Sequence, residues 1–173
     1  VLADADTDLA ARSIRFAAAL NGGRTCMAPR RVLVERSAYD AFLGSLLDAV
    51  RSGASPAEPS TGEAERSRAL AHAAVVAGGR ELDPGRGGLP LVVADCPADT
   101  ALFRGEHFGP ALAVTPVASA EEAVRLHGSV EQKLATAVFT RDTRRARALA
   151  LQLGSGVVTV NDCVIPTGHP GVG

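Results

Sequence analysis

Short apolar runs alternate with segments of helical periodicity along this chain, and this order limits the possible fold more than any other feature. The runs lack a polar alternation, which is typical of strands covered on both faces. Helix start signals such as Ser119 and Asp142 stand between them. The sequence therefore predicts a three-layer α/β domain with a mostly parallel sheet. The expected strands are Arg31–Val34, Leu89–Asp95, Ala111–Val114, Ala135–Thr140 and Val157–Val160.

Capping residues and glycines indicate where the helices begin and end. The first helix is expected to run from about Asp6 to Leu20, and Ser37 begins a second with a capping-box-like start. A third is expected from Glu63 to Ala77, and Gly154 stops the helix that Asp142 caps. The loops expected between these elements include Gly53–Gly62 and Asp83–Gly88.

The length of 173 residues favours a single domain, residues 1–173, with a sizeable core. Aromatic residues make up 3% of the chain and tryptophan is absent, so we expect a core of Ala, Val and Leu. The chain begins at Val1 without a methionine. This beginning suggests part of a longer or processed protein.

Charge and cysteine content exclude several classes of function. A formal net charge of -1 gives no electrostatic footprint for nucleic acid or an anionic membrane, and neither partner is expected. No apolar run is long enough to span a bilayer. The spacing of the three cysteines does not fit a zinc site, so we expect no metal site. We expect the cysteines to be reduced thiols in a cytoplasmic protein.

Two motifs carry residue types suited to chemistry. The first is Asn21-Gly22-Gly23-Arg24-Thr25-Cys26, placed between the first expected helix and the first expected strand. A cysteine at such a junction is suited to presenting a nucleophile to a cleft, although position alone is equally consistent with a small buried residue. The second motif is Glu106-His107-Phe108-Gly109-Pro110, just before another expected strand.

Together these motifs resemble those of the aldehyde dehydrogenase superfamily, which carries an Asn-x-Gly-Gln-x-Cys motif and, much later, Glu-x-Phe-Gly-Pro. Further segments resemble family strands in the expected order, so that the similarity covers essentially the whole chain. Arg24 departs from the family's usual glutamine. The resembling segments are Val1–Ala10, Arg31–Val34, Ala137–Asp142 and Gly156–Asn161.

The resemblance implies specific roles. Cys26 would be the catalytic nucleophile, forming a thiohemiacetal with the aldehyde and then a thioester, with its own backbone amide helping to hold the oxyanion. Glu106 and Phe108 would bind the cofactor, NAD or NADP, through the nicotinamide ribose and ring. Without the resemblance, Glu106 is read as a solvated loop carboxylate and Phe108 as an ordinary core aromatic.

A loop after the last expected strand falls where family members line the substrate entrance, which makes Asn161 and Cys163 substrate-loop candidates. A plain turn is an equal alternative there. Cys96 has no assigned role, and the histidines have no partner at a motif spacing, so a dyad of a histidine with Cys26 stays only as an alternative.

The family's general-base segment, Glu-Leu-Gly-Gly-Lys, and its upstream cofactor-binding domain are not recognisable in this sequence, and we expect them to be supplied by other segments. The leading hypothesis is thus part of the catalytic domain of an NAD(P)-dependent enzyme that oxidises an aldehyde, in a homo-oligomer. The alternatives are acyl transfer to coenzyme A through the same thioester, and a non-catalytic scaffold or oligomerisation domain.

Overall fold

The computed structural model describes residues 1–53, 61–83 and 90–163. Most of the two expected loops, Gly53–Gly62 and Asp83–Gly88, and the first residue of the expected strand Leu89–Asp95 lie outside these ranges. The helices are α1 (Thr7–Ala19), η1 (Leu20–Gly23), α2 (Arg36–Ser52), α3 (Thr61–Val76), α4 (Ala101–Arg104), α5 (Ala120–Gly128) and α6 (Thr143–Leu153). The strands are β1 (Arg31–Glu35), β2 (Arg80–Glu81), β3 (Leu91–Ala94), β4 (Ala111–Val117), β5 (Ala135–Val138) and β6 (Val157–Val160).

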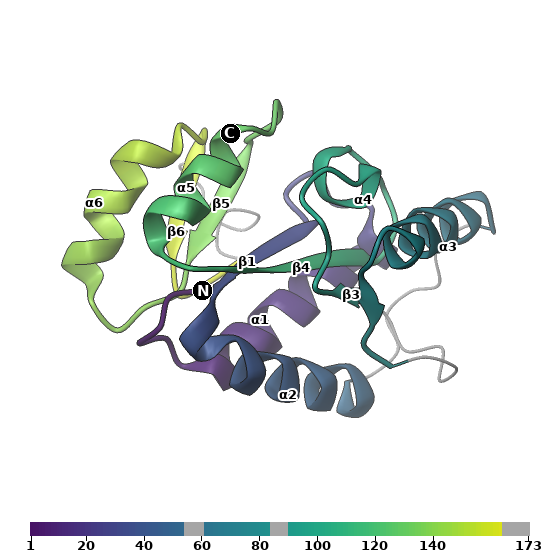
Figure 1. The fold of residues 1–173 in the computed structure, drawn as a ribbon, viewed down its shortest axis with the longest axis horizontal. Helices are drawn as coiled ribbons and strands as arrows, with labels where there is room; N and C mark the ends of the chain where they lie inside the picture. Colours follow the sequence, from purple (N-terminus) through teal and green to yellow (C-terminus); the bar gives the residue numbers. More distant parts are fainter. Residues whose placement is uncertain (54–60, 84–89, 164–173) are drawn as a thin grey trace.

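The main sheet has the order β1-β4-β3-β2, in which β1, β4 and β3 are parallel and β2 is an antiparallel edge strand. Alternate residues of each strand face opposite layers. Val32, Leu112 and Val92 pack against α1 and α2, whereas Ala113 and Val93 pack with α3 and α4 on the other face. Figure 1 shows the sheet between these layers. The three-layer α/β fold with a mostly parallel sheet is confirmed.

The described residues form two sheets, which the sequence did not indicate. Strands β5 and β6 form a separate parallel pair, covered by α6. The first residues of the chain bridge this pair and the main sheet. The carbonyls of Leu33 and Phe139 accept hydrogen bonds from the Val1 amino group, at 2.7 Å, and from the Leu2 N–H, at 2.9 Å, respectively.

Asp4 fixes the next turn of this bridge. Its carboxylate accepts hydrogen bonds from the Thr140 hydroxyl and from the backbone N–H groups of Arg141 and Asp142. These bonds hold the pKa of Asp4 below its ordinary value. Residues at the start of the chain are therefore fastened to residues some 136 positions later.

The expected capping box at Ser37 is wrong. Helix α2 begins at Arg36, and its N-cap residue, Glu35, makes no side-chain capping bond. The Glu35 carboxylate instead accepts from the Ala3 N–H and pairs with Arg145 at 3.1 Å. The Glu35 side chain is therefore bonded to residues distant in sequence and does not cap the helix.

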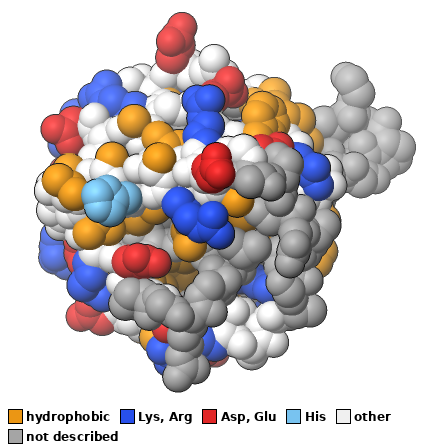
Figure 2. Space-filling view, turned by 90° about the vertical axis from the view of Figure 1, so that its right-hand side faces the viewer, with side chains coloured by type: hydrophobic (Ala, Val, Ile, Leu, Met, Phe, Trp, Pro, Cys, Tyr) orange, Lys and Arg blue, Asp and Glu red, His pale blue; other side chains and the backbone are white. Residues whose placement is uncertain are grey.

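Alanine, valine and leucine dominate the buried residues as expected, with Phe42 and Phe103 the largest fully buried side chains. In the described ranges no helix is both long and apolar enough to cross a membrane. On the face shown in Figure 2, acidic and basic side chains are interspersed, without an area of a single sign. This distribution agrees with the small net charge.

In a polypeptide that begins at Val1, stability is expected to rise between pH 6 and 8. Burial lowers the pKa of the Val1 amino group from 8.0 to about 6, so the unfolded chain binds more protons than the folded one in this interval. Since each pKa unit corresponds to about 1.4 kcal/mol, the free energy of unfolding is expected to rise by roughly 2 to 3 kcal/mol between pH 6 and 8. Urea denaturation at a series of pH values measures it.

Burial also lowers the pKa of His107 and of His127, so stability is lost further as pH falls below about 6.5. A chain acetylated at Val1 provides the control, because it lacks the amine but keeps an N–H for the Leu33 carbonyl. The acetylated chain should lose the rise in the free energy of unfolding between pH 6 and 8. It should keep the loss of stability that the histidines cause below about pH 6.5. An equal rise in the acetylated chain would contradict the assignment to Val1.

Candidate active site

The segment that carries Cys26 begins where α1 ends, one residue before the expected end at Leu20. Asn21, Gly22 and Gly23 have φ angles of 52°, 64° and 78°. Glycine adopts this left-handed region freely, and asparagine tolerates it better than most residues. The turn leaves Cys26 exposed on the connection between α1 and β1. The two glycines thus serve as the sequence predicted.

The second motif lies directly against this turn. The Gly109 N–H donates to the Gly23 carbonyl at 3.2 Å. A Cβ placed on Gly23 would come within 2.4 Å of the Gly109 carbonyl carbon and 2.6 Å of the Pro110 nitrogen. The fold therefore brings together two motifs that are separated by about eighty residues, and only glycine permits their approach.

Arg30 connects the same two segments through its side chain. Its Nε donates to the His107 carbonyl at 2.7 Å, and its Nη1 donates to the Cys26 carbonyl at 3.1 Å. The guanidinium also lies over the Phe108 ring, 5.4 Å from its centroid. Burial lowers the pKa of Arg30, and the charges of Glu106 and Cys26 oppose this change. Sequence reasoning missed this residue, since no local pattern marks a contact across the fold.

Glu106 and Phe108 are both exposed, with Phe108 47% accessible. The amide nitrogen of Gln132, oriented as a donor, lies 2.6 and 3.0 Å from the two Glu106 carboxylate oxygens. Phe108 is thus not the core aromatic of the alternative interpretation, because a core residue would be buried. Gln132 is a second neighbour that no motif indicated. The cofactor roles of Glu106 and Phe108 stay predictions.

His107 does not face Cys26 as a catalytic partner would. Its ring is buried, and Nε2 lies 3.1 Å from the Ala111 carbonyl. The His107 backbone carbonyl, and not its ring, bonds to Arg30, which also bonds to the Cys26 carbonyl. Arg24 is exposed and donates to the Asn21 carbonyl at 3.1 Å. Neither side chain contacts Cys26 through a hydrogen bond or ion pair among the described residues.

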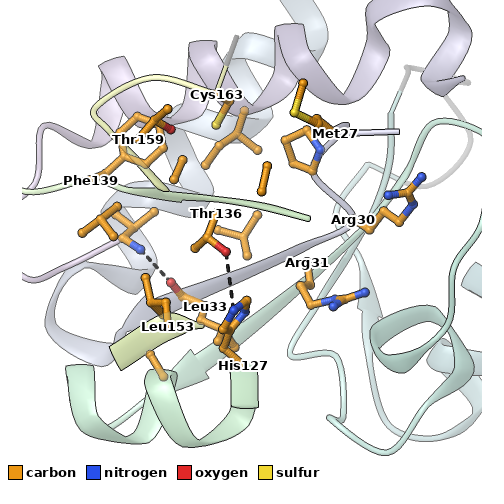
Figure 3. Close-up of a pocket in the computed structure, with 18 of the residues that line it drawn as sticks. Met27, Arg30, Arg31, Leu33, His127, Thr136, Phe139, Leu153, Thr159 and Cys163 are labelled. Carbon is orange, nitrogen blue, oxygen red and sulfur yellow. Dashed lines mark hydrogen bonds between the residues drawn. The ribbon is translucent and has the colours of Figure 1, made fainter. Parts of the chain in front are cut away.

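A cavity of about 200 Å³ reaches from the two motifs into the interior. Cys26, Glu106 and Gln132 are among the residues that line it, together with parts of β1, α5 and β5. Figure 3 shows Met27 and Arg30 at one side of it and Phe139 and Thr159 at the other. The motifs therefore lie at one end of a hollow that is largely lined by apolar groups and that also reaches Val1 and Leu2.

A buried histidine is one of the polar residues in the cavity wall. His127 Nε2 lies 3.1 Å from the Ser155 hydroxyl, which is 2.7 Å from the Thr136 hydroxyl. Figure 3 shows His127 and Thr136 pointing toward one another. The sequence offered no partner for this histidine, because the three residues come from separate elements. Their mutual hydrogen bonds indicate a satisfied interior cluster.

The two substrate-loop candidates lie in different surroundings. The Asn161 side chain accepts from the Thr140 N–H and donates to the Thr140 carbonyl, both at 2.9 Å, which continues the pairing of β5 and β6. Asn161 does not line the cavity. Cys163 lines it, and its N–H donates to the Ser13 hydroxyl at 3.2 Å. Contact with a substrate stays a prediction for both.

Cys26 is expected to be alkylated at least about 100-fold faster than the other cysteines, because a thiolate must be both formed and reached. Cys96 is 1% exposed, and burial raises its thiol pKa. Burial raises the pKa of Cys163 to about 12. Limited treatment with iodoacetamide followed by peptide mapping measures the order. In denaturant the three rates should converge, and earlier labelling of Cys96 or Cys163 in the native protein would contradict the prediction.

The described residues contain no group of three or more His, Cys, Asp or Glu side chains placed to hold a metal ion. The groups available for chemistry here are thus the Cys26 thiol, the Glu106 carboxylate, the Arg30 guanidinium and backbone amides. This set suits a nucleophilic thiol beside a binding surface.

Comparison with known proteins gives consistent matches. A sequence model of the aldehyde dehydrogenase family matches residues 1–172. The vanillin dehydrogenase of Pseudomonas fluorescens is 33% identical over 98% of this chain and 37% of its own length. The 2-hydroxymuconic semialdehyde dehydrogenase of Pseudomonas putida is 32% identical over 93% of this chain and 38% of its own length.

Solved structures resemble the fold equally well. An NAD-dependent benzaldehyde dehydrogenase from Corynebacterium glutamicum has a TM-score of 0.81 and 31% identity, covering 93% of this chain and 38% of that one. An indole-3-acetaldehyde dehydrogenase complexed with NAD+ has a TM-score of 0.82 and 30% identity, covering 93% of this chain and 37% of that one. The chain therefore spans little more than a third of these relatives.

Proposed function

Because this chain belongs to the aldehyde dehydrogenase family, we propose that it is the nucleophile-bearing part of the catalytic domain of an enzyme that oxidises an aldehyde with NAD. The observation that carries the proposal is the contact of the two motifs, in which the Gly109 N–H meets the Gly23 carbonyl. It places the segment of Cys26 beside the segment of Glu106 and Phe108, so a thiol adduct and a bound cofactor can share one site.

The exposed groups fit such a cofactor. The Phe108 ring offers a flat apolar surface, and the exposed Glu106 carboxylate can accept hydrogen bonds from ribose hydroxyls. Arg30 lies over the Phe108 ring, and the Gln132 amide donates to the Glu106 carboxylate. NAD, when bound, supplies a hydride acceptor. The relatives named as NAD-dependent or complexed with NAD+ support NAD as the cofactor.

In the proposed reaction the Cys26 thiolate attacks the aldehyde carbon, and the carbonyl oxygen becomes an oxyanion. The backbone N–H of Cys26 can donate to that oxyanion without reorganisation. Loss of hydride from the same carbon re-forms the carbonyl and leaves a thioester on Cys26. Water then adds to the thioester, releasing the carboxylic acid and restoring the thiol.

The general base that activates this water is assigned in our proposal to the rest of the enzyme. His107 is unsuited, because it is buried and its Nε2 faces the Ala111 carbonyl.

Cys26, Cys96 and Cys163 are free thiols, which supports a reducing, cytoplasmic setting. Strand β6 has no neighbour on its outer edge in the described ranges, which supports self-association through that edge.

Replacing Glu106 with glutamine is expected to slow hydride transfer on the order of 10- to 100-fold, because a less firmly held nicotinamide loses the orientation needed for reaction. The experiment uses the whole enzyme that contains this chain. It is mixed rapidly with an aldehyde and NAD, and NADH absorbance is followed through a single turnover. Unchanged hydride transfer together with weaker aldehyde binding would contradict the role of Glu106.

Glu121→Gln is the matched control, since Glu121 is an exposed carboxylate in the first turn of α5 and does not line the cavity. Its rate should equal that of the wild type. Absence of NADH formation by the wild-type enzyme across aliphatic and aromatic aldehydes would overturn the proposed function itself.

A further inference from the structure

We propose that Arg30 is a positioning residue that holds the nucleophile segment, residues 24–29, in a fixed relation to the cofactor segment, residues 105–110. This inference rests on the proposed function and adds to it a residue that neither motif contains. Arg30 donates one hydrogen bond to the Cys26 carbonyl and one to the His107 carbonyl, and its guanidinium carbon lies over the Phe108 ring.

The backbone joins the two segments at their ends. The Gly109 N–H donates to the Gly23 carbonyl, and the pairing of β1 with β4 begins where the Ala113 N–H donates to the Arg30 carbonyl. Between these two joints, the Arg30 side chain adds hydrogen bonds to the Cys26 and His107 carbonyls. These side-chain bonds hold the part of each segment that lies closest to Cys26 and Phe108.

Only arginine can make these contacts simultaneously. Its guanidinium is planar, carries donors in fixed directions and stays charged. Nε and Nη1 therefore reach two carbonyls while the guanidinium carbon lies over an aromatic ring. A lysine ammonium is a point charge on a flexible stem and cannot reproduce this geometry.

The neighbouring arginine has a different environment. The Arg31 guanidinium lies 5.9 Å from the centroid of Phe103, on α4. Arg104 gives a closer match to one half of the Arg30 arrangement, because its Nε donates to the Ala98 carbonyl at 3.1 Å. It directly precedes the cofactor segment, but its side-chain bond is to a residue of neither segment. It is a suitable control for loss of an arginine-to-carbonyl bond that joins no functional segments.

The consequence lies in the reaction geometry. Misplacement of reacting groups by about 1 Å costs on the order of 100-fold in rate. The Cys26 carbonyl belongs to the residue that bears the thiol, and Phe108 belongs to the surface proposed for the nicotinamide. Loss of Arg30 should thus slow hydride transfer far more than it weakens binding of either reactant.

The experiment uses the whole enzyme with Arg30→Met, Arg30→Lys and Arg104→Met. The first readout is amide hydrogen exchange, without cofactor, in peptides that cover residues 24–29 and 105–110. The Met variant should speed exchange in both peptides by about tenfold or more, because each has lost its shared attachment. The second readout is single-turnover hydride transfer, expected to fall about 10- to 100-fold, with the NAD dissociation constant changed less than about threefold.

Arg30→Lys should resemble the Met variant in both readouts, and it also serves if the Met variant fails to fold. Arg104→Met should match the wild type. Faster exchange in only one segment, or hydride transfer within about twofold of the wild-type rate in both Arg30 variants, would overturn the inference. If the wild type forms no NADH, the proposed function fails, and the exchange readout still decides whether Arg30 joins the two segments.

Discussion

Replacing Cys26 with alanine is expected to reduce aldehyde-dependent NADH formation by about 10⁴-fold or more, the scale of loss when a covalent nucleophile is removed. No other described thiol can substitute. Cys96 is almost completely buried, and the pKa of Cys163 is raised to about 12. Steady-state NADH formation at saturating aldehyde and NAD, with equal amounts of folded enzyme, measures the effect.

The intermediate can be identified directly. Acid quenching during a single turnover should leave an acyl group on the peptide that contains Cys26, seen by mass spectrometry as the aldehyde less two hydrogen atoms. Cys163→Ala is the matched control and should retain both the adduct and most of the activity. An acyl group on Cys163, or NADH formation that survives the loss of Cys26, would contradict the assignment of the nucleophile.

Gly23→Ala is expected to lower the free energy of unfolding by about 2 to 5 kcal/mol and to abolish most activity in the protein that folds. The new methyl group would meet backbone atoms of Gly109 and Pro110 at 2.4 to 2.6 Å, and these atoms cannot move away as a flexible side chain can. Left-handed backbone adds about 1 to 2 kcal/mol for alanine, and overpacking about 1 to 3 kcal/mol. Urea denaturation measures the stability.

Gly154→Ala separates the two contributions. Gly154 has a φ of +60°, close to that of Gly23, but a Cβ there would meet nothing within 4 Å. We expect a loss of only about 1 to 2 kcal/mol and no change in hydride transfer. Equal effects of the two substitutions would show that conformational strain, and not the contact of the two motifs, accounts for the loss at Gly23.

Local sequence patterns predicted the elements whose stability is mostly local. Strands β1, β4 and β6 and helices α1 and α6 lie close to the expected positions. Each has an apolar pattern, and the two helices also begin at a capping residue, Asp6 or Asp142. Strand β2 and helix α4 were missed. A two-residue exposed strand and a four-residue helix are too short to produce a periodic pattern, and they form because longer elements pack around them.

Contacts between distant segments could not be predicted in the same way. The motif residues Cys26 and Glu106 could be named from sequence, but the partners that surround them could not. Arg30 and Gln132 look like ordinary surface residues, and Glu35 looks like an ordinary helix-start carboxylate. Their partners are set by the packing of distant segments, as is the pairing of the described strands in two sheets.

The bridge formed by the first residues has a consequence for how the protein reaches its native state. During synthesis, Val1 can pair with Leu33 after 32 further residues have been added. Asp4 cannot pair with Thr140 until 136 further residues have been added. Closing the longer loop costs roughly 1 kcal/mol more in chain entropy, and distant pairings of this kind slow folding. Residues 1–4 are therefore among the last residues of this part of the protein to find all their partners, and until then the edges of β1 and β5 are open to pairing with another nascent chain.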